Sequence, residues 1–170
     1  LKLVINCEFH EGQFSFNLSG SAGNGLYLTD SATLGICIGA TLATLGIETY
    51  VHQGILDSFS VSTPRESWLN AKYPNPVGWG FRDATNLLAH CISKTLGQID
   101  KRLQVGQSAV SQSTIQLQFE NRPPLVMSLC GGRGGTAQAA GPAGIRLWHN
   151  TDFSASIEDL ETSYPIRIES

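Results

Sequence analysis

The residues with the clearest chemical potential surround one glycine-rich stretch, Gly131-Gly-Arg-Gly-Gly135. Cys130 comes directly before this stretch, at the end of a predicted strand. A cysteine at such a strand-to-turn junction can act as a nucleophile, with the backbone N–H groups of Gly131 and Gly132 as an oxyanion hole. The alternative is a buried structural thiol, which is the more common role of a free cysteine.

Arg133 lies inside the same glycine-rich stretch. Its guanidinium group can hold an anionic ligand through two parallel hydrogen bonds. The stretch has neither the Lys-Ser/Thr of a phosphate-binding P-loop nor the glycine spacing of a dinucleotide-binding turn. The alternative to anion binding is therefore tight backbone packing, which glycines allow because they lack a Cβ atom.

Histidines and one tryptophan complete the set of candidate residues. His10, His52, His90 and His149 are the candidate bases for a cysteine nucleophile, and their spacing matches no metal-binding motif, so we predict no metal ligand in this chain. Trp79, between Gly78 and Gly80, either lines a ligand pocket or covers the core.

The first part of the chain predicts a β-hairpin followed by a helix and a strand. Apolar and polar residues alternate over residues 1–7 and 13–19, with a turn between them, and again over residues 58–63. Three N-cap residue types precede a helix predicted over residues 31–45, which ends at Gly46. This helix carries no charge, so we expect it to be buried nearly all round.

The second part of the chain predicts one more helix and several strands. Apolar spacing indicates a helix over residues 83–97 and strands over residues 113–119, 125–130, 145–149 and 164–168. The acidic cluster at residues 158–161 is interpreted as a solvated turn. Together these elements predict a single α+β domain over residues 1–170, with two buried helices on a mixed β-sheet.

Composition excludes several classes of protein. The 170 residues carry a net charge of −3 with only 15% charged residues, which excludes an obvious nucleic-acid binder. No signal peptide and no apolar run of membrane-spanning length is present, so we expect no membrane association. The four isolated cysteines are typical of buried thiols in an intracellular, cytoplasmic protein, and two disulfides are the alternative.

Several segments resemble, in order, the motifs of the hydantoinase B/oxoprolinase family. Residues 14–25 are similar to its "DFSGSS…GN" segment, and Ser128-Leu-Cys-Gly-Gly-Arg-Gly-Gly-Thr-Ala is similar to its "E-x-x-G-G-G-x-G-A" segment. His149-Asn-Thr151 resembles "H-x-T-N-T", and residues 158–169 resemble "E-x-L-E-x-x-Y-P-L-R-V-E". Residues 54–70 and 73–80 also look like family segments, and the resemblance runs over nearly the whole chain.

The resemblance implies a fold similar to the C-terminal part of the hydantoinase B subunit, related to the large subunits of acetone and acetophenone carboxylases. Such subunits work in ATP-dependent hydrolases of cyclic amides, including hydantoinases, 5-oxoprolinases and lactamases. Cys130 and His149 are then our candidate catalytic residues. The candidate substrate-binding residues are Arg133, Gly131, Gly132, Trp79 and Asn150.

The resemblance also implies partner chains. We expect a hydantoinase A-type subunit that binds ATP, or the missing N-terminal part of hydantoinase B, and therefore an oligomer. The family's HxxD metal segment has no counterpart here, so we predict no cofactor on this chain and assign ATP and a divalent metal to the partners. The alternatives are a small stand-alone biosynthetic enzyme that acts on a small molecule, or a non-catalytic scaffold subunit.

Overall fold

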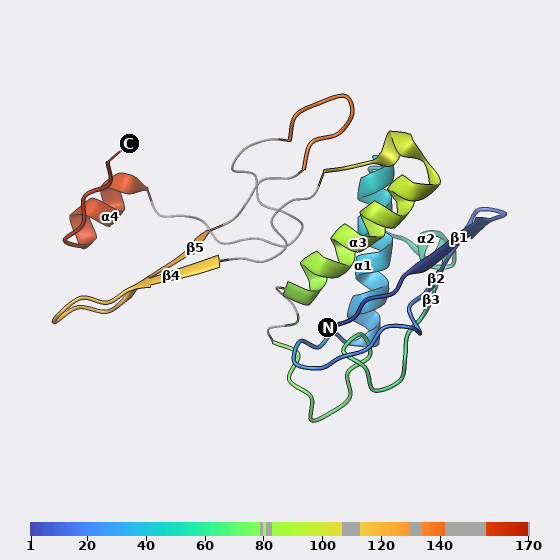
Figure 1. The fold of residues 1–170 in the computed structure, drawn as a ribbon, viewed down its shortest axis with the longest axis horizontal. Helices are drawn as coiled ribbons and strands as arrows, with labels where there is room; N and C mark the ends of the chain where they lie inside the picture. Colours follow the sequence, from blue (N-terminus) through green and yellow to red (C-terminus); the bar gives the residue numbers. More distant parts are fainter. Residues whose placement is uncertain (79, 81–82, 107–112, 130–133, 142–155, 170) are drawn as a thin grey trace.

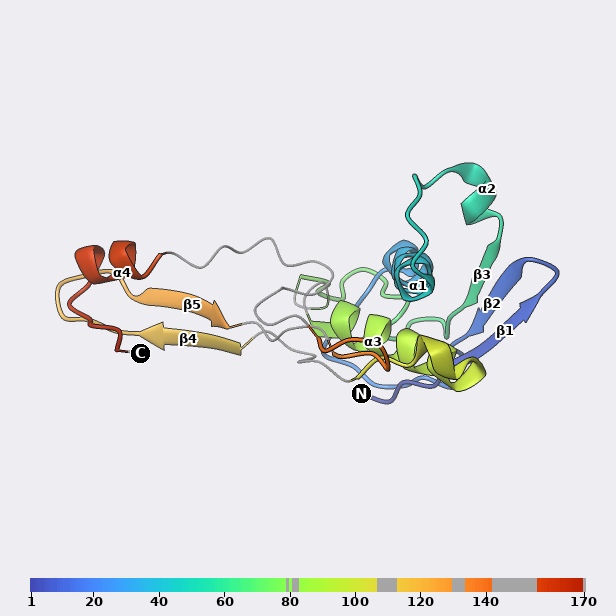
Figure 2. The same cartoon turned by 90° about the horizontal axis from the view of Figure 1, so that it is seen from above.

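The computed structural model describes residues 1–78, 80, 83–106, 113–129, 134–141 and 156–169. Figures 1 and 2 show two helices, α1 (Asp30–Leu45) and α3 (Asp83–Ile99), packed side by side against a small sheet. The sheet consists of β1 (Asn6–His10), β2 (Gln13–Asn17) and β3 (Phe59–Ser62). This arrangement confirms the predicted α+β class, with two helices on a mixed sheet.

The three-stranded sheet combines two kinds of pairing. β1 and β2 are antiparallel and are joined by Glu11 and Gly12, which both have positive φ angles, as a tight hairpin turn requires. β2 and β3 are parallel, and α1 lies in the connection between them. Phe16 on β2 faces the helices and is buried, whereas its neighbours Ser15 and Asn17 face outward.

Local signals at both ends define α1, as the sequence predicts. Thr29 is the N-cap, and its Oγ1 accepts a hydrogen bond from the backbone N–H of Ala32. Gly46 ends the helix in the left-handed conformation, with φ of 68°. The prediction that this helix is buried nearly all round is wrong, because one face remains exposed. The exposed positions on this face are all small, namely Ser31, Ala32, Gly35, Gly39 and Ala43.

The core lies between α1, α3 and the sheet. Leu88, Ile92 and Leu96 recur along one face of α3 and are fully or almost fully buried, as their helical spacing predicts. Trp68 is also fully buried, and its indole N–H reaches the backbone carbonyl of Lys2 at 3.4 Å. The short helix α2 (Gln53–Leu56) and the 3₁₀ turn η1 (Lys101–Leu103) flank this core.

A second group of elements follows in the chain. β4 (Ser113–Leu117) and β5 (Leu125–Leu129) lie within the two strands predicted in this region, and they form an antiparallel pair. Arg122 donates to the backbone carbonyl of Ser163 at 2.6 Å, which links this pair to α4 (Ile157–Ser163). The predicted strand over residues 145–149 lies outside the described residues.

Two predictions near the C-terminal end are wrong. The acidic cluster is not a turn but belongs to α4. Ser156 caps this helix by accepting a hydrogen bond from the N–H of Asp159. The acidic side chains of the first turn stabilise the helix because they lie at the positive end of its dipole. Residues 164–168 form no strand. The N–H of Ile168 donates to the Glu161 carboxylate instead of a neighbouring strand, and Pro165 has no N–H to donate.

The helices of the described part are too short or too polar to cross a membrane.

Candidate functional site

The candidate catalytic and substrate-binding residues implied by the resemblance share one outcome. All of them lie outside the described residues, so their proposed roles stay predictions: Trp79, Cys130, Gly131, Gly132, Arg133, His149 and Asn150. The candidate site described below is therefore built from other side chains.

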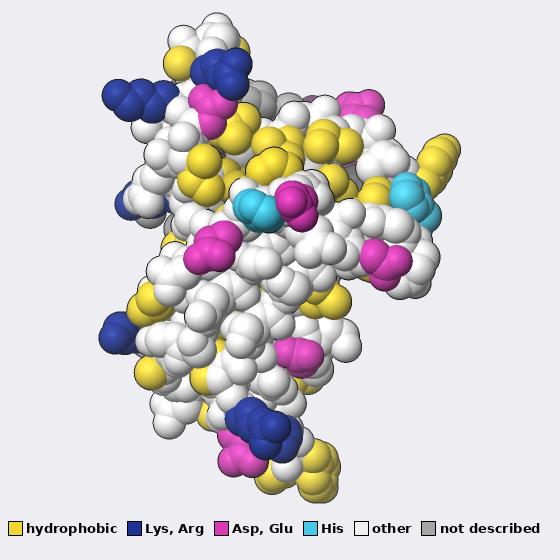
Figure 3. Space-filling view, turned by 90° about the vertical axis from the view of Figure 1, so that its right-hand side faces the viewer, with side chains coloured by type: hydrophobic (Ala, Val, Ile, Leu, Met, Phe, Trp, Pro, Cys, Tyr) yellow, Lys and Arg dark blue, Asp and Glu magenta, His cyan; other side chains and the backbone are white. Residues whose placement is uncertain are grey.

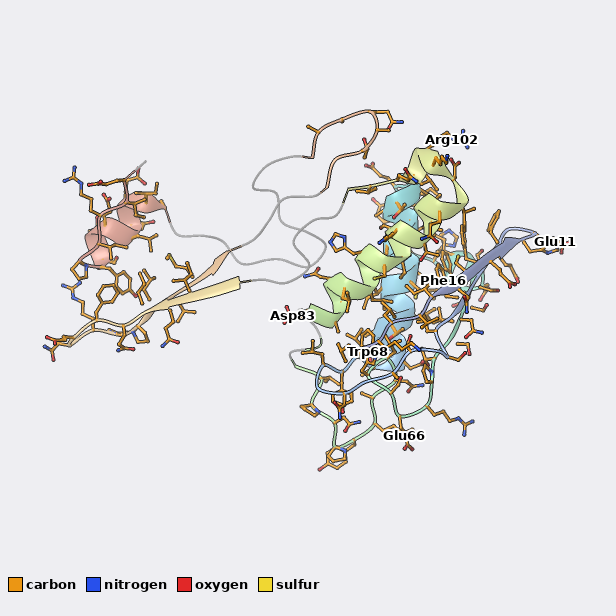
Figure 4. The ribbon with its side chains drawn as sticks, viewed as in Figure 1. Glu11, Phe16, Glu66, Trp68, Asp83 and Arg102 are labelled. Atoms are coloured by element: carbon orange, nitrogen blue, oxygen red, sulfur yellow. The ribbon has the colours of Figure 1, made fainter. Side chains whose placement is uncertain are left out.

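A line of polar side chains runs along one side of α3. Asp83, Asn86 and His90 are three and four residues apart, which places them on one stripe of the helix. We call these three residues the α3 polar stripe. The apolar residues Leu88, Ile92 and Leu96 occupy the opposite side of the helix. In Figure 4 Asp83 accordingly lies on the side of α3 away from the sheet residue Phe16.

The side chain of Asn86 contains a buried polar atom without a hydrogen-bond partner in the described residues. Its Oδ1 has no exposed surface and accepts no hydrogen bond within the described part of the chain. A buried acceptor without a donor costs about 1–3 kcal/mol. Native proteins seldom retain such a group, and those that do often use it for binding or catalysis.

His90 follows Asn86 by one helical turn. Half of its side chain is buried, and this burial lowers the pKa of the imidazole below its ordinary value of 6.5. Burial therefore favours the neutral form of His90, in which one ring nitrogen carries a proton and the other is basic. The α3 polar stripe thus combines a carboxylate, a carboxamide and a neutral imidazole.

The three described cysteines, Cys7, Cys37 and Cys91, are free thiols. Burial raises the pKa of all three, and that of Cys37 rises to about 12. A thiol with a raised pKa is a poor nucleophile, because the thiolate is the reactive form. Cys37 is buried, as predicted, whereas Cys7 and Cys91 are only partly buried.

A second polar cluster lies at the start of α1. Thr63 donates to the carboxylate of Asp30 at 2.8 Å and accepts from the side-chain amide of Asn70 at 3.0 Å. Each of these groups has a partner, so the cluster has a clear structural purpose: it fixes the segment after β3 against the helix. We regard it as a structural support rather than a second site.

Aromatic side chains form a row across the sheet. Phe9, Phe14 and Phe59 are paired in register, and the ring centroids are 4.5 and 5.3 Å apart along the row. Burial decreases toward the edge strand, where Phe9 is 58% exposed. Figure 3 views the side of the molecule that carries the sheet and shows hydrophobic side chains gathered in a band. We call these three residues the phenylalanine row.

Sequence reasoning missed the α3 polar stripe for an identifiable reason. It considered His90 as one of four separate histidines and Asp83 only as a residue at the start of a helix. The spacing of Asp83, Asn86 and His90 was the available signal, because residues three and four apart share a helix face. The lack of a partner for Asn86 Oδ1 has no signature in the sequence.

Comparison with known proteins gives one match. A search of curated proteins and a search of solved structures each find no match to this chain. The family model for hydantoinase B/oxoprolinase matches residues 1–170. Because this match covers the full length of the sequence, the chain belongs to the hydantoinase B/oxoprolinase family.

Proposed function

We propose that the chain is a component of an ATP-dependent cyclic amide hydrolase, or of a related carboxylase, and works with partner chains. The family match over residues 1–170 is the observation that carries this proposal. The expected partner is a hydantoinase A-type subunit that binds ATP, or the N-terminal part of a hydantoinase B subunit. The substrate is a small ring that contains an amide.

The chemistry of such a ring explains why ATP is needed. An amide is a weak electrophile because the nitrogen lone pair is shared with the carbonyl group. Transfer of the γ-phosphoryl group of ATP to the carbonyl oxygen produces ADP and a more reactive ring. Water then adds to the carbonyl carbon, the C–N bond breaks as the ring nitrogen takes up a proton, and an acyl phosphate remains. A second water hydrolyses this acyl phosphate to the carboxylate and phosphate.

The second half of this reaction requires a group that exchanges protons near pH 7. The neutral imidazole of His90 fits this requirement, since it can accept a proton from the attacking water and return one to the ring nitrogen. Asp83 lies on the same stripe, two helical turns before His90, and adds a negative charge to this side of the helix. The α3 polar stripe is therefore the part of the described chain that best suits this reaction.

The surface of the chain supports an assembly rather than a lone subunit. The exposed face of α1 carries no charged side chain beyond the first turn, and the phenylalanine row leaves Phe9 largely uncovered. Helices that are apolar on all sides are normally covered, and uncharged aromatic surfaces are typical of the centre of protein interfaces. Both features agree with contact between this chain and a partner subunit.

Reconstitution with a hydantoinase A-type subunit tests the proposal. The chain, the subunit and the two together are assayed for release of ADP with hydantoin or 5-oxoproline as substrate. We expect ring opening and ADP release in equal amounts only when both proteins and ATP are present. Ring opening by this chain alone without ATP, or no ring opening by any combination with a panel of ring amides, would contradict the proposal.

A further inference from the structure

We propose that Asn86 recognises the amide edge of the ring directly, with its side-chain carboxamide paired to the ring N–H and C=O. This inference rests on the proposed function and adds a specificity-determining residue to it. The starting observation is the Asn86 Oδ1 atom, a buried acceptor that receives no hydrogen bond within the described residues. A ring N–H is a donor that would satisfy it.

The geometry of a ring amide makes this pairing specific. In a small ring the amide is held cis, so its N–H and C=O point to the same edge. In an open chain the amide is almost always trans, and the two groups point in opposite directions. A carboxamide side chain presents one acceptor and two donors, so only the cis edge can form two parallel hydrogen bonds with it.

The neighbours of Asn86 support this role. His90 lies one turn further along the same stripe, where a ring held by Asn86 brings its C–N bond toward the neutral imidazole. Asp83 lies on the other side of Asn86, and its carboxylate suits the amino group that ring opening produces. The residue that recognises the amide edge and the residue that exchanges protons are thus one turn apart on the same helix face.

Access to Asn86 requires only a local movement. Part of the residue is exposed even though Oδ1 is covered. The terminal torsion of an asparagine side chain is broad and roughly two-fold, and rotation about it is the movement that would turn the polar edge of the amide outward. The hydrogen bonds to the ring then replace an unsatisfied acceptor, which favours the bound state.

The test measures binding by calorimetry, without ATP and without the partner subunit. The probes are hydantoin and 5-oxoproline, each compared with its N-methylated counterpart, and the open-chain amide N-methylacetamide. For the wild-type chain we expect the N–H rings to bind about tenfold or more tightly than the N-methylated rings. N-methylacetamide should bind no better than the N-methylated rings.

Two variants decide whether Asn86 is responsible. Asn86→Leu should abolish the preference for N–H rings, and Asn86→Ser serves the same purpose if the leucine variant does not fold. Gln98→Leu is the matched control, because Gln98 is an exposed amide on the same helix. Its preference should equal that of the wild type.

The outcomes separate this inference from the proposed function. Equal binding of the N–H and N-methylated rings by the wild type, or an unchanged preference in the Asn86 variants, overturns the role of Asn86. ATP-dependent ring opening is measured separately in the reconstituted complex. A wild-type complex that opens rings while Asn86→Leu has an unchanged KM for the ring contradicts the inference alone. A wild-type chain that prefers N–H rings, in a complex that opens none, contradicts the proposed function alone.

Discussion

The hydroxyl oxygens of Thr44 and Ser93 lie 2.7 Å apart and join α1 to α3 in a largely apolar interface. Thr44 has only one hydroxyl proton, which it donates to the carbonyl of Ala40 at 2.7 Å. Ser93 is therefore the donor in the bond between the helices. This bond fixes the two helices at one relative position along their axes.

Removal of this bond should weaken the interface between the two helices. We expect Thr44→Val to lower the free energy of unfolding by about 1–2 kcal/mol, because the buried hydroxyl of Ser93 loses its acceptor. The double variant Thr44→Val/Ser93→Ala should lose less than the sum of the two single variants. Urea denaturation measures all three. Thr95→Val is the control, since in the described part of the chain Thr95 donates to the carbonyl of Cys91 in its own helix. A loss as large as that of Thr44→Val would contradict a specific role for the bond.

Asn86→Leu should make the protein more stable. Leucine removes an acceptor that pays a desolvation cost without a hydrogen bond, so we expect a gain of about 1–3 kcal/mol in the free energy of unfolding. Asn70→Leu provides the contrast, because Asn70 does hydrogen-bond to Thr63 and should lose about 1 kcal/mol. Denaturant titration of both variants tests this, and a loss of stability in Asn86→Leu would show that the carboxamide serves the fold.

His90 should make stability depend on pH. Its pKa is lowered in the folded state by burial, so the unfolded chain binds the proton first as the pH falls. Stability is therefore highest above the unfolded pKa of about 6.5 and decreases with acidification until the lower folded pKa is reached. His90→Gln should remove this part of the pH profile, measured by denaturation between pH 7.5 and pH 5, values chosen to bracket that pKa. Gln98→Leu, at an exposed position on the same helix, should keep the wild-type profile.

Two glycines at different places in α1 should respond to alanine in opposite ways. Gly39 lies inside the helix with open space where a Cβ would stand, so Gly39→Ala should stabilise the chain by about 0.5–1 kcal/mol. Gly46 has φ of 68°, and Gly46→Ala should cost about 1 kcal/mol or more. Thermal denaturation of the two variants measures the difference. A destabilising Gly39→Ala would mean that another part of the molecule approaches this face.

Elements with strong local signals were predictable from the sequence. Thr29 and Gly46 mark the ends of α1, and the alternation around Glu11-Gly12 indicates the hairpin. Helix α4, which begins at the N-cap Ser156, was not predicted from the sequence. The strand pattern over residues 164–168, which follows this helix, received more weight. The exposure of α1 was not predictable, because a helix without charge is usually buried and its sequence does not show which faces the rest of the chain reaches.

The candidate site also has features that the sequence predicts and features that only the structure shows. Residue types and spacing are enough to place Asp83, Asn86 and His90 on one helix face. Whether Asn86 Oδ1 finds a donor depends on chain segments distant in sequence, so only the structure reveals it. The lowered pKa of His90 likewise results from burial, which no local pattern encodes.

The parallel pairing of β2 and β3 has a consequence for the order of folding. The β1–β2 hairpin closes through a two-residue turn, whereas β3 reaches β2 only after the connection that contains α1 and α2. The sheet should therefore form in two stages, with α1 in place before the second. The N–H of Phe14 bonds to the carbonyl of Ser58, just before β3, and that of Leu18 bonds to the carbonyl of Ser62 in β3. Pulsed hydrogen exchange should therefore show their protection after that of the hairpin amides. Until that second stage, β2 is an unpaired edge that is exposed to association with other chains.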